Sequence, residues 1–230
     1  MTGTVLLVGT RKGMWIGRSD EARAEWDFTG PHFDMEEVYS CMVDNRTDPP
    51  RIYAGASSMW LGPRVRRSDD LGATWSHSGA GLTYGDGEGV PPIPTIWSLA
   101  VAPDGALLAG VEPAGLFRSE DGGATFTHVR GLRDHESQPT WQPGAGGLIL
   151  HTIVPHPTDP ARTWVGISAV GIFETIDGGR TWEPRNRGVR ADFNPDPHPV
   201  TGQCVHKFAA AAGEPETLYQ QNHCGMYRST

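Results

Sequence analysis

Four large ring side chains recur at one equivalent position of a repeated short segment. The segments are "VYSCMV", "IWSLAV", "LHTIVP" and "VHKFAA", and their ring residues are Tyr39, Trp97, His151 and His206. Each ring offers a flat face for stacking and a hydrogen-bonding edge, so four rings gathered together would suit a sugar or another flat polar ligand. The alternative is that these rings wedge between structural units as part of the core.

Carboxylates indicate a second chemistry, the hydrolysis of a glycosidic bond, which uses one carboxyl group as acid and another as base or nucleophile. The acids in loops that could border one site are Glu36, Glu37, Asp86, Glu88, Glu112, Asp134, Glu136, Asp192 and Asp196. Loop acids are usually solvated, and no motif distinguishes these. Glu112 is the strongest candidate because a short strand fixes its position, opposite Trp97 in the expected hairpin, and Glu37 is a weaker one.

A third set of side chains combines cysteine with histidine. Pairing "GQCVH" with "QQNHC" would place Cys204 opposite Cys224 and His206 opposite Asn222, with His223 close by. A zinc site needs about four such ligands. Because side chains alternate between the two faces of a strand, simultaneous convergence is not expected. We predict reduced thiols, no metal and no cofactor.

A repeated turn motif identifies the scaffold that must position these side chains. It occurs in "RRSDDLGATW", "RSEDGGATF" and "ETIDGGRTW". Its members are Ser68, Asp70, Gly72 and Trp75, then Ser119, Asp121, Gly123 and Phe126, and then Thr175, Asp177, Gly179 and Trp182. Hydroxyl and carboxylate groups can bind backbone N–H groups across a tight turn, where glycine adopts positive φ. Three copies of one motif therefore indicate a structural role.

Each motif follows three short β-branched or aromatic runs, and a fourth run begins at its Trp or Phe. Repeats of about 50 residues with this pattern are typical of β-propeller blades. The sequence predicts an all-β fold, a β-propeller of four-stranded antiparallel blades in one incomplete domain over residues 1–230. The expected blades span about 1–30, 31–80, 90–130 and 145–187, with a partial blade at about 200–230.

The first unit lacks an inner strand and the last lacks an outer one. About four and a half blades of six or seven are therefore expected in this chain. The remainder of a longer chain is expected to close the ring, because an open ring would expose blade faces and strand edges.

The turn motif resembles the Asp-box, or BNR repeat, of sialidase-like propellers, over essentially the whole chain. The resemblance implies that the boxes lie on the face away from the ligand. It does not decide the activity, because such propellers include both enzymes and binding proteins. Sialidases also use three arginines and a Phe/Tyr-Arg-Ile-Pro segment. That segment does not occur here, and the early Arg11 has neighbours that do not match.

We expect a ligand- or partner-binding module. A glycan or protein would bind at the funnel face, formed by the loops that lead into the inner strands and by the turns between the two middle strands of each blade. Trp60 and Trp141 lie in loops on this face, where exposed tryptophan suits sugar stacking or protein contact. The alternative is a glycoside hydrolase of the exo-sialidase-like type that uses rim carboxylates.

Charge and composition exclude other partners. The net charge is −8 and no block of Lys or Arg occurs, which argues against binding to nucleic acid or to an anionic membrane surface. No apolar run approaches the ~18 residues of a membrane-spanning helix. The start of the chain does not read as a signal peptide, and three cysteines do not make an even disulfide set, so we expect a cytoplasmic protein.

Overall fold

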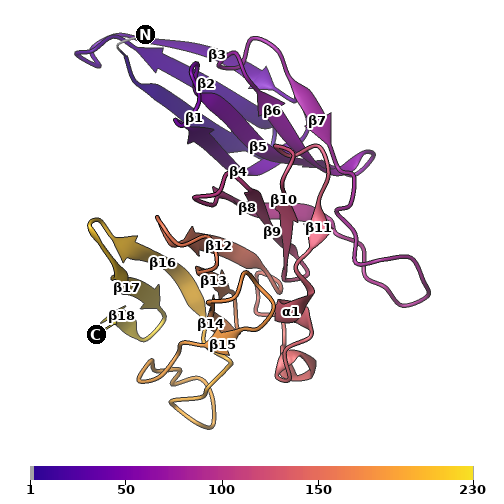
Figure 1. The fold of residues 1–230 in the computed structure, drawn as a ribbon, viewed down its shortest axis with the longest axis vertical. Coiled ribbons are helices and arrows are strands. Elements are labelled where there is room, and N and C mark those ends of the chain that lie inside the picture. Colours follow the sequence, from indigo (N-terminus) through magenta and orange to yellow (C-terminus); the bar gives the residue numbers. More distant parts are fainter. Residues whose placement is uncertain (1–2, 230) are drawn as a thin grey trace.

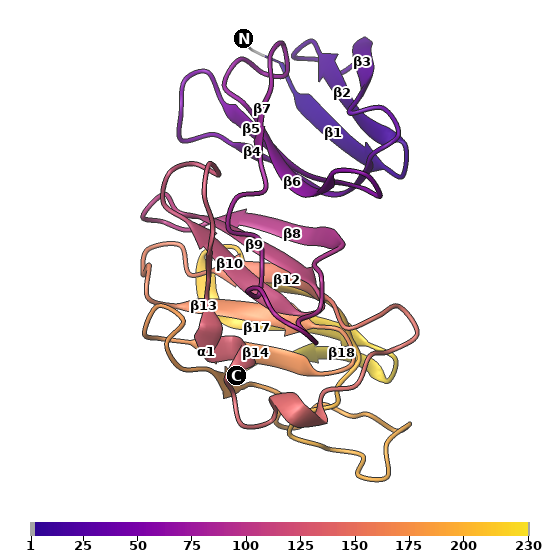
Figure 2. The same ribbon diagram turned by 90° about the vertical axis from the view of Figure 1, so that its right-hand side faces the viewer.

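The computed structural model describes residues 3–229 of the chain. Five antiparallel sheets follow one another in chain order along an arc, from indigo to yellow in Figure 1. In the turned view the first sheet lies at the top, and the fourth and fifth sheets overlap in the lower half (Figure 2). The predicted all-β fold, a β-propeller of antiparallel blades, is confirmed.

Three blades have four strands. The second blade contains β4 (Glu37–Asp44), β5 (Arg51–Ser58), β6 (Gly62–Ser68) and β7 (Ser76–Ser78). The third contains β8 (Thr95–Val101), β9 (Leu107–Glu112), β10 (Gly115–Ser119) and β11 (Thr127–His128). The fourth contains β12 (Leu150–Pro155), β13 (Thr163–Ile167), β14 (Gly171–Thr175) and β15 (Glu183–Pro184).

The first and fifth blades have three strands each. The first contains β1 (Val5–Thr10), β2 (Gly13–Ser19) and β3 (Trp26–His32), and the fifth contains β16 (Val205–Ala211), β17 (Glu214–Asn222) and β18 (Gly225–Arg228). Two short helices, α1 (Arg130–Arg133) and η1 (Gln138–Thr140), lie between the third and fourth blades. Among residues 3–229, no helix has the length and apolar character needed to cross a membrane.

The hydrophobic core lies between successive blades. Met14 and Ile16 of β2 pack with Ile52 of β5, and further along the arc Phe208 of β16 packs with Trp164 of β13. The middle strands β9 and β13 are buried almost throughout, because a neighbouring sheet covers each of their faces. Both faces are therefore apolar, and a strict two-residue alternation is absent from these strands.

The three repeated turns share one hydrogen-bond pattern. In the first, the backbone N–H of Gly72 donates to Ser68 Oγ at 2.7 Å, and Ser68 Oγ donates to Asp70 Oδ1 at 2.7 Å. The N–H of Thr74 also donates to Asp70 Oδ1, at 2.8 Å, while its hydroxyl donates to Asp70 Oδ2 at 2.6 Å. The other two turns repeat these bonds at Asp121 and Asp177. Each carboxylate is thus used in closing its turn.

Candidate functional site

Each of the four ring residues lies at a β-bulge in the first strand of its blade. In the second blade Val38 pairs with Ala56 and Ser40 pairs with Gly55, so Tyr39 is an extra residue between them. The same irregularity occurs at Trp97, His151 and His206. A bulge re-aims one side chain out of the regular alternation of a strand. The equivalence seen in the sequence is therefore also an equivalence of backbone geometry.

The bulges shift the strand pairing from what the sequence suggested. Thr95, not Trp97, lies opposite Glu112, and Val205, not His206, lies opposite Asn222. Both predicted pairs were wrong, by two positions at Trp97 and by one at His206, and the extra residue of the bulge accounts for one position in each case. The contact between Trp97 and Glu112 forms nevertheless, since the indole Nε1 donates to Glu112 Oε2 at 3.0 Å.

Five candidate residues from the first three blades form a continuous line of contacts, which we call the acid–ring strip. Arg11 Nε donates to Glu37 Oε1 at 3.0 Å, and the hydroxyl of Tyr39 donates to Glu37 Oε2 at 3.2 Å. The rings of Tyr39 and Trp97 stack with centroids 4.2 Å apart and an interplanar angle of 27°. Trp97 then reaches Glu112. Both candidate glutamates are thus held by neighbouring ring donors.

Burial and the two glutamates of the strip keep its tyrosine neutral. Burial raises the pKa of Tyr39, and so do its hydrogen bond to Glu37 and the nearby charge of Glu112. The pKa of Arg11 is also raised, chiefly by the hydrogen bond to Glu37. The strip therefore contains a neutral phenol and an indole, each donating to one glutamate side chain, and a single guanidinium, that of Arg11.

The two histidine positions differ from the strip. His151 Nε2 lies 3.0 Å from the carbonyl oxygen of Val205, so its ring joins the fourth and fifth blades, and burial lowers its pKa. His206 is exposed, and its ring meets the ring of His223 at a centroid distance of 4.4 Å. The wedge interpretation therefore suits His151, whereas His206 lies open to solvent.

The cysteines do not pair as the hairpin suggested. Cys204 lies beside His206 and His223, whereas Cys224 Sγ accepts the backbone N–H of Asp192 at 3.4 Å. All three cysteines of the chain are free thiols in this structure. The predicted juxtaposition of Cys204 with Cys224 was wrong, because the bulge at His206 and the β17–β18 turn place the second thiol elsewhere.

One of the two loop tryptophans is not on the surface. Trp60 is 89% exposed, but Trp141 is only 7% exposed. The indole of Trp141 packs on Phe173 at a centroid distance of 5.5 Å and donates to Ser137 Oγ at 2.9 Å. The expectation that Trp141 is an exposed loop tryptophan was wrong, because the chain after η1 folds this side chain into the core beside the fourth blade.

Glu36 is likewise excluded as a solvated rim acid. It is buried, and its carboxylate accepts a hydrogen bond from the buried guanidinium of Arg66, which also lies over the ring of Phe33. This buried ion pair was not anticipated. The sequence pattern, an acid directly before a strand and an arginine on a middle strand, is too common to predict a buried ion pair.

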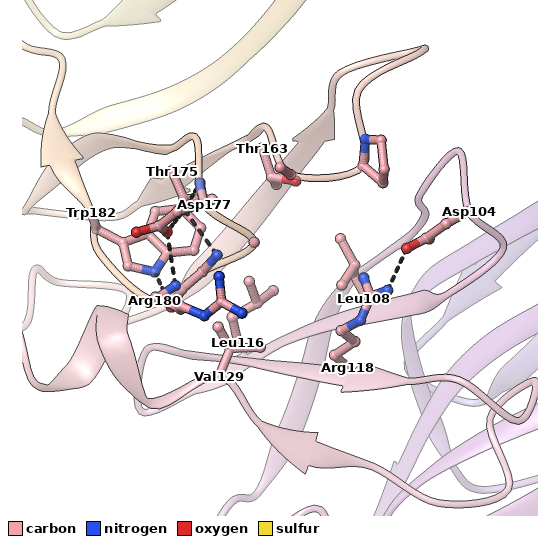
Figure 3. A pocket seen from close by; sticks show the side chains of 14 residues that line it. Asp104, Leu108, Leu116, Arg118, Val129, Thr163, Thr175, Asp177, Arg180 and Trp182 are labelled. Carbon is pink, nitrogen blue, oxygen red and sulfur yellow. Dashed lines mark hydrogen bonds and ion pairs between the residues drawn. The ribbon is translucent and has the colours of Figure 1, made fainter.

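A cavity between two blades lies at the end of the strands opposite to the acid–ring strip. A cavity of about 400 Å³ lies between the third and fourth blades, and Figure 3 shows side chains that line it. It is lined by Asp104, Leu108, Arg118, Thr163, Asp177, Arg180 and Trp182, among others. Asp104 follows β8 and Asp177 follows β14, whereas Trp97 begins β8, so this cavity and the strip are on opposite faces. Asp177 already bonds within its turn, so the strip remains the candidate site.

Comparisons with known proteins show the fold. No family model and no curated protein sequence matches this chain. The chain resembles the GH74 xyloglucanase from Xanthomonas campestris, with a TM-score of 0.57 and 19% identity, over 98% of this chain and 42% of that chain. It also resembles YCF48 from Cyanidioschyzon merolae, with a TM-score of 0.58 and 11% identity, over 97% and 63% of the two chains.

A third similar structure is PorZ of Porphyromonas gingivalis, a surface component of the type-IX secretion system. Its TM-score is 0.57 and its identity 14%, over 94% of this chain and 29% of that chain. These neighbours are β-propeller proteins, and this chain spans less than two thirds of the length of each. At such low identity the likeness establishes the propeller fold alone.

Proposed function

We propose that this chain is part of a β-propeller module that binds a neutral glycan on the acid–ring strip. The observation that carries the proposal is the stacked Tyr39–Trp97 pair with a glutamate at each end. Tyr39 is 38% exposed, so its ring remains open to a ligand. Aromatic faces stack on the C–H faces of sugars, and carboxylates accept hydrogen bonds from sugar hydroxyl groups.

The charges on the strip favour a neutral sugar over an acidic one. Two glutamates stand against the single Arg11, and that arginine already forms an ion pair with Glu37. An anionic sugar would therefore meet two carboxylates with no free guanidinium in the strip. One structure of similar fold is named a xyloglucanase, which is consistent with a carbohydrate ligand.

A panel of immobilised neutral and acidic oligosaccharides tests this proposal. We expect binding to neutral members and loss of binding in Tyr39→Ala. The matched control is Tyr219→Ala, which removes an exposed tyrosine of the fifth blade outside the strip. Binding confined to acidic sugars or to peptides, or binding that survives Tyr39→Ala unchanged, would contradict it.

Hydrolysis of the bound glycan is the second candidate function, favoured by the presence of two carboxylates on one strip. Glu37 and Glu112 approach the stacked rings from opposite ends, and glycosidases use a pair of carboxyl groups. Release of a fluorophore from a panel of glycosides is the direct assay. Activity that disappears in both Glu37→Gln and Glu112→Gln would support hydrolysis, whereas binding without release leaves the binding function alone.

An exposed apolar face on the first blade supports the proposal that further blades complete the ring. Leu6, Trp15 and Phe28 of the first blade are 43%, 37% and 48% exposed on one face of its sheet. The opposite face of the same sheet is buried against the second blade. We expect this chain to self-associate as its concentration rises, and Phe28→Lys to reduce that association in light scattering.

A further inference from the structure

We propose that Cys204, His206 and His223 bind a divalent transition metal, with zinc as the principal ion. One ligand atom from each side chain lies within 4.8 Å of the other two. Tetrahedral zinc, with bonds of about 2.0–2.3 Å, holds its ligand atoms about 3.3–3.6 Å apart. Both imidazoles are on exposed side chains, and metal binding would draw the three atoms from their present separation to that spacing.

The bulge of the fifth blade explains why these residues meet. Val205 pairs with Asn222 and Lys207 with Gln221, so His206 is the extra residue between two paired positions. The side chain of Val205 is buried. Cys204 and His206 are its two neighbours in the chain. His223 follows Asn222 directly in the β17–β18 turn, and it therefore lies beside the bulge.

A neighbouring amide prepares one imidazole for metal binding. Gln221 Nε2 donates to the carbonyl oxygen of Asn222 at 2.8 Å, which leaves Gln221 Oε1 as an acceptor. This Oε1 lies 3.1 Å from His206 Nδ1, so Nδ1 is the donor in this hydrogen bond and Nε2 is the ring nitrogen left for a metal. Histidine ligands of zinc are commonly fixed by such a second hydrogen bond.

The thiol and the exposure of the cluster indicate an open site. Cys204 is half-buried, and its thiol would give up its proton on binding a metal. His206 and His223 are both exposed, which leaves a fourth position for water or a small ligand. Three protein ligands with one open position are typical of zinc sites that act on a substrate. This inference does not depend on glycan binding.

Cobalt provides the direct test, because thiolate ligation gives Co²⁺ an intense near-ultraviolet charge-transfer band. The protein is stripped with EDTA and titrated with Co²⁺ alone and then with Zn²⁺. We expect one Co²⁺ per chain, the charge-transfer band, and its loss when Zn²⁺ displaces the cobalt. Cys204→Ser should lose the band, whereas Cys41→Ser and Cys224→Ser should keep it. A band that is absent from the unsubstituted protein, or that survives Cys204→Ser, would overturn the site.

Zinc affinity, measured by competition with a chromophoric chelator, tests the histidines. We expect His206→Ala and His223→Ala each to weaken binding by more than about 100-fold, and Gln221→Ala to weaken it by about 10- to 100-fold. His77→Ala, at an exposed histidine of the second blade, is the control and should bind zinc normally. Circular dichroism identifies any variant that fails to fold. Unchanged affinity in both folded histidine variants would refute the assignment.

Discussion

The indole N–H of Trp97 donates to Glu112 Oε2 at 3.0 Å although the two residues are not opposite each other in the β8–β9 ladder. The contact exists because Trp97 is the extra residue of a bulge, which turns its side chain toward the end of β9. Its ring also stacks on Tyr39 from the second blade. A single bulge thus fixes a carboxylate and an aromatic face beside each other.

Replacing Trp97 by phenylalanine separates these two roles. Trp97→Phe keeps a ring for stacking on Tyr39 but removes the donor to Glu112. Because the pair is partly exposed, we expect a loss of about 1 kcal/mol in the free energy of unfolding, below the range for a buried hydrogen bond to a charged group. Glycan affinity should fall about tenfold. Urea denaturation and titration calorimetry measure the two effects, and a variant with unchanged affinity would show that Glu112 needs no fixed orientation.

The two loop tryptophans should respond to truncation in opposite ways. Trp141→Ala removes a 7% exposed indole from the core of the fourth blade, so we expect a loss of about 3–5 kcal/mol in the free energy of unfolding. Trp60→Ala should change it by less than about 0.5 kcal/mol, because Trp60 is 89% exposed. Urea denaturation of both variants makes the comparison. Equal effects would mean that Trp141 is not packed as described.

The hydroxyl group of each repeated turn should matter for stability. Ser119 is buried, and its Oγ accepts the N–H of Gly123 at 2.8 Å. Ser119→Ala leaves that buried N–H without its acceptor, so we expect a loss of about 1–3 kcal/mol in the free energy of unfolding. Ser76→Ala is the control, since Ser76 is exposed and makes only a long hydrogen bond of 3.4 Å to the carbonyl of Arg67. A loss no larger than that of Ser76→Ala would show that the Ser119 hydroxyl does not stabilise the turn.

The repeated turns could be predicted from the sequence because all their hydrogen bonds are local. Ser68, Asp70 and Gly72 lie within five residues, and the same residue types bond in the same way in each copy. The blade order follows from the spacing of these turns, since each one ends a third strand. The propeller fold could therefore be predicted from local sequence patterns, without any tertiary information.

The candidate site was harder to predict from the sequence, because it depends on the register in which the inner strands pair. One extra residue in the inner strand changes which side chains meet, and strict alternation therefore mispaired Trp97 and His206. The expected closeness of Cys204, His206 and His223 is found in the structure, whereas Cys224 lies against Asp192. Trp141 was misplaced for another reason, since its contact with Phe173 depends on how a long loop packs, and no local pattern encodes that.

His128 should make stability depend on pH in the mildly acidic range. Its ring stacks on Phe117 at 5.0 Å and meets the edge of Tyr84 at 5.0 Å, while Nε2 is buried and has no hydrogen-bond partner within residues 3–229. Burial, aided by the charges of Arg133 and Arg130, lowers the pKa of His128 from 6.5 to about 4. The folded protein therefore keeps this imidazole neutral where the unfolded chain binds a proton.

The sign of the effect follows from that difference in proton binding. The stabilising contribution of His128 is complete above pH 6.5 and is lost as the pH falls toward about 4, because the unfolded state is protonated first. His128→Phe keeps an aromatic ring beside Phe117 and removes the titration. We expect its free energy of unfolding to fall less steeply with decreasing pH over this range, in urea denaturation at several pH values. His198→Phe, at an exposed histidine, should keep the original slope. Equal slopes in all three proteins would mean that His128 is not the group responsible.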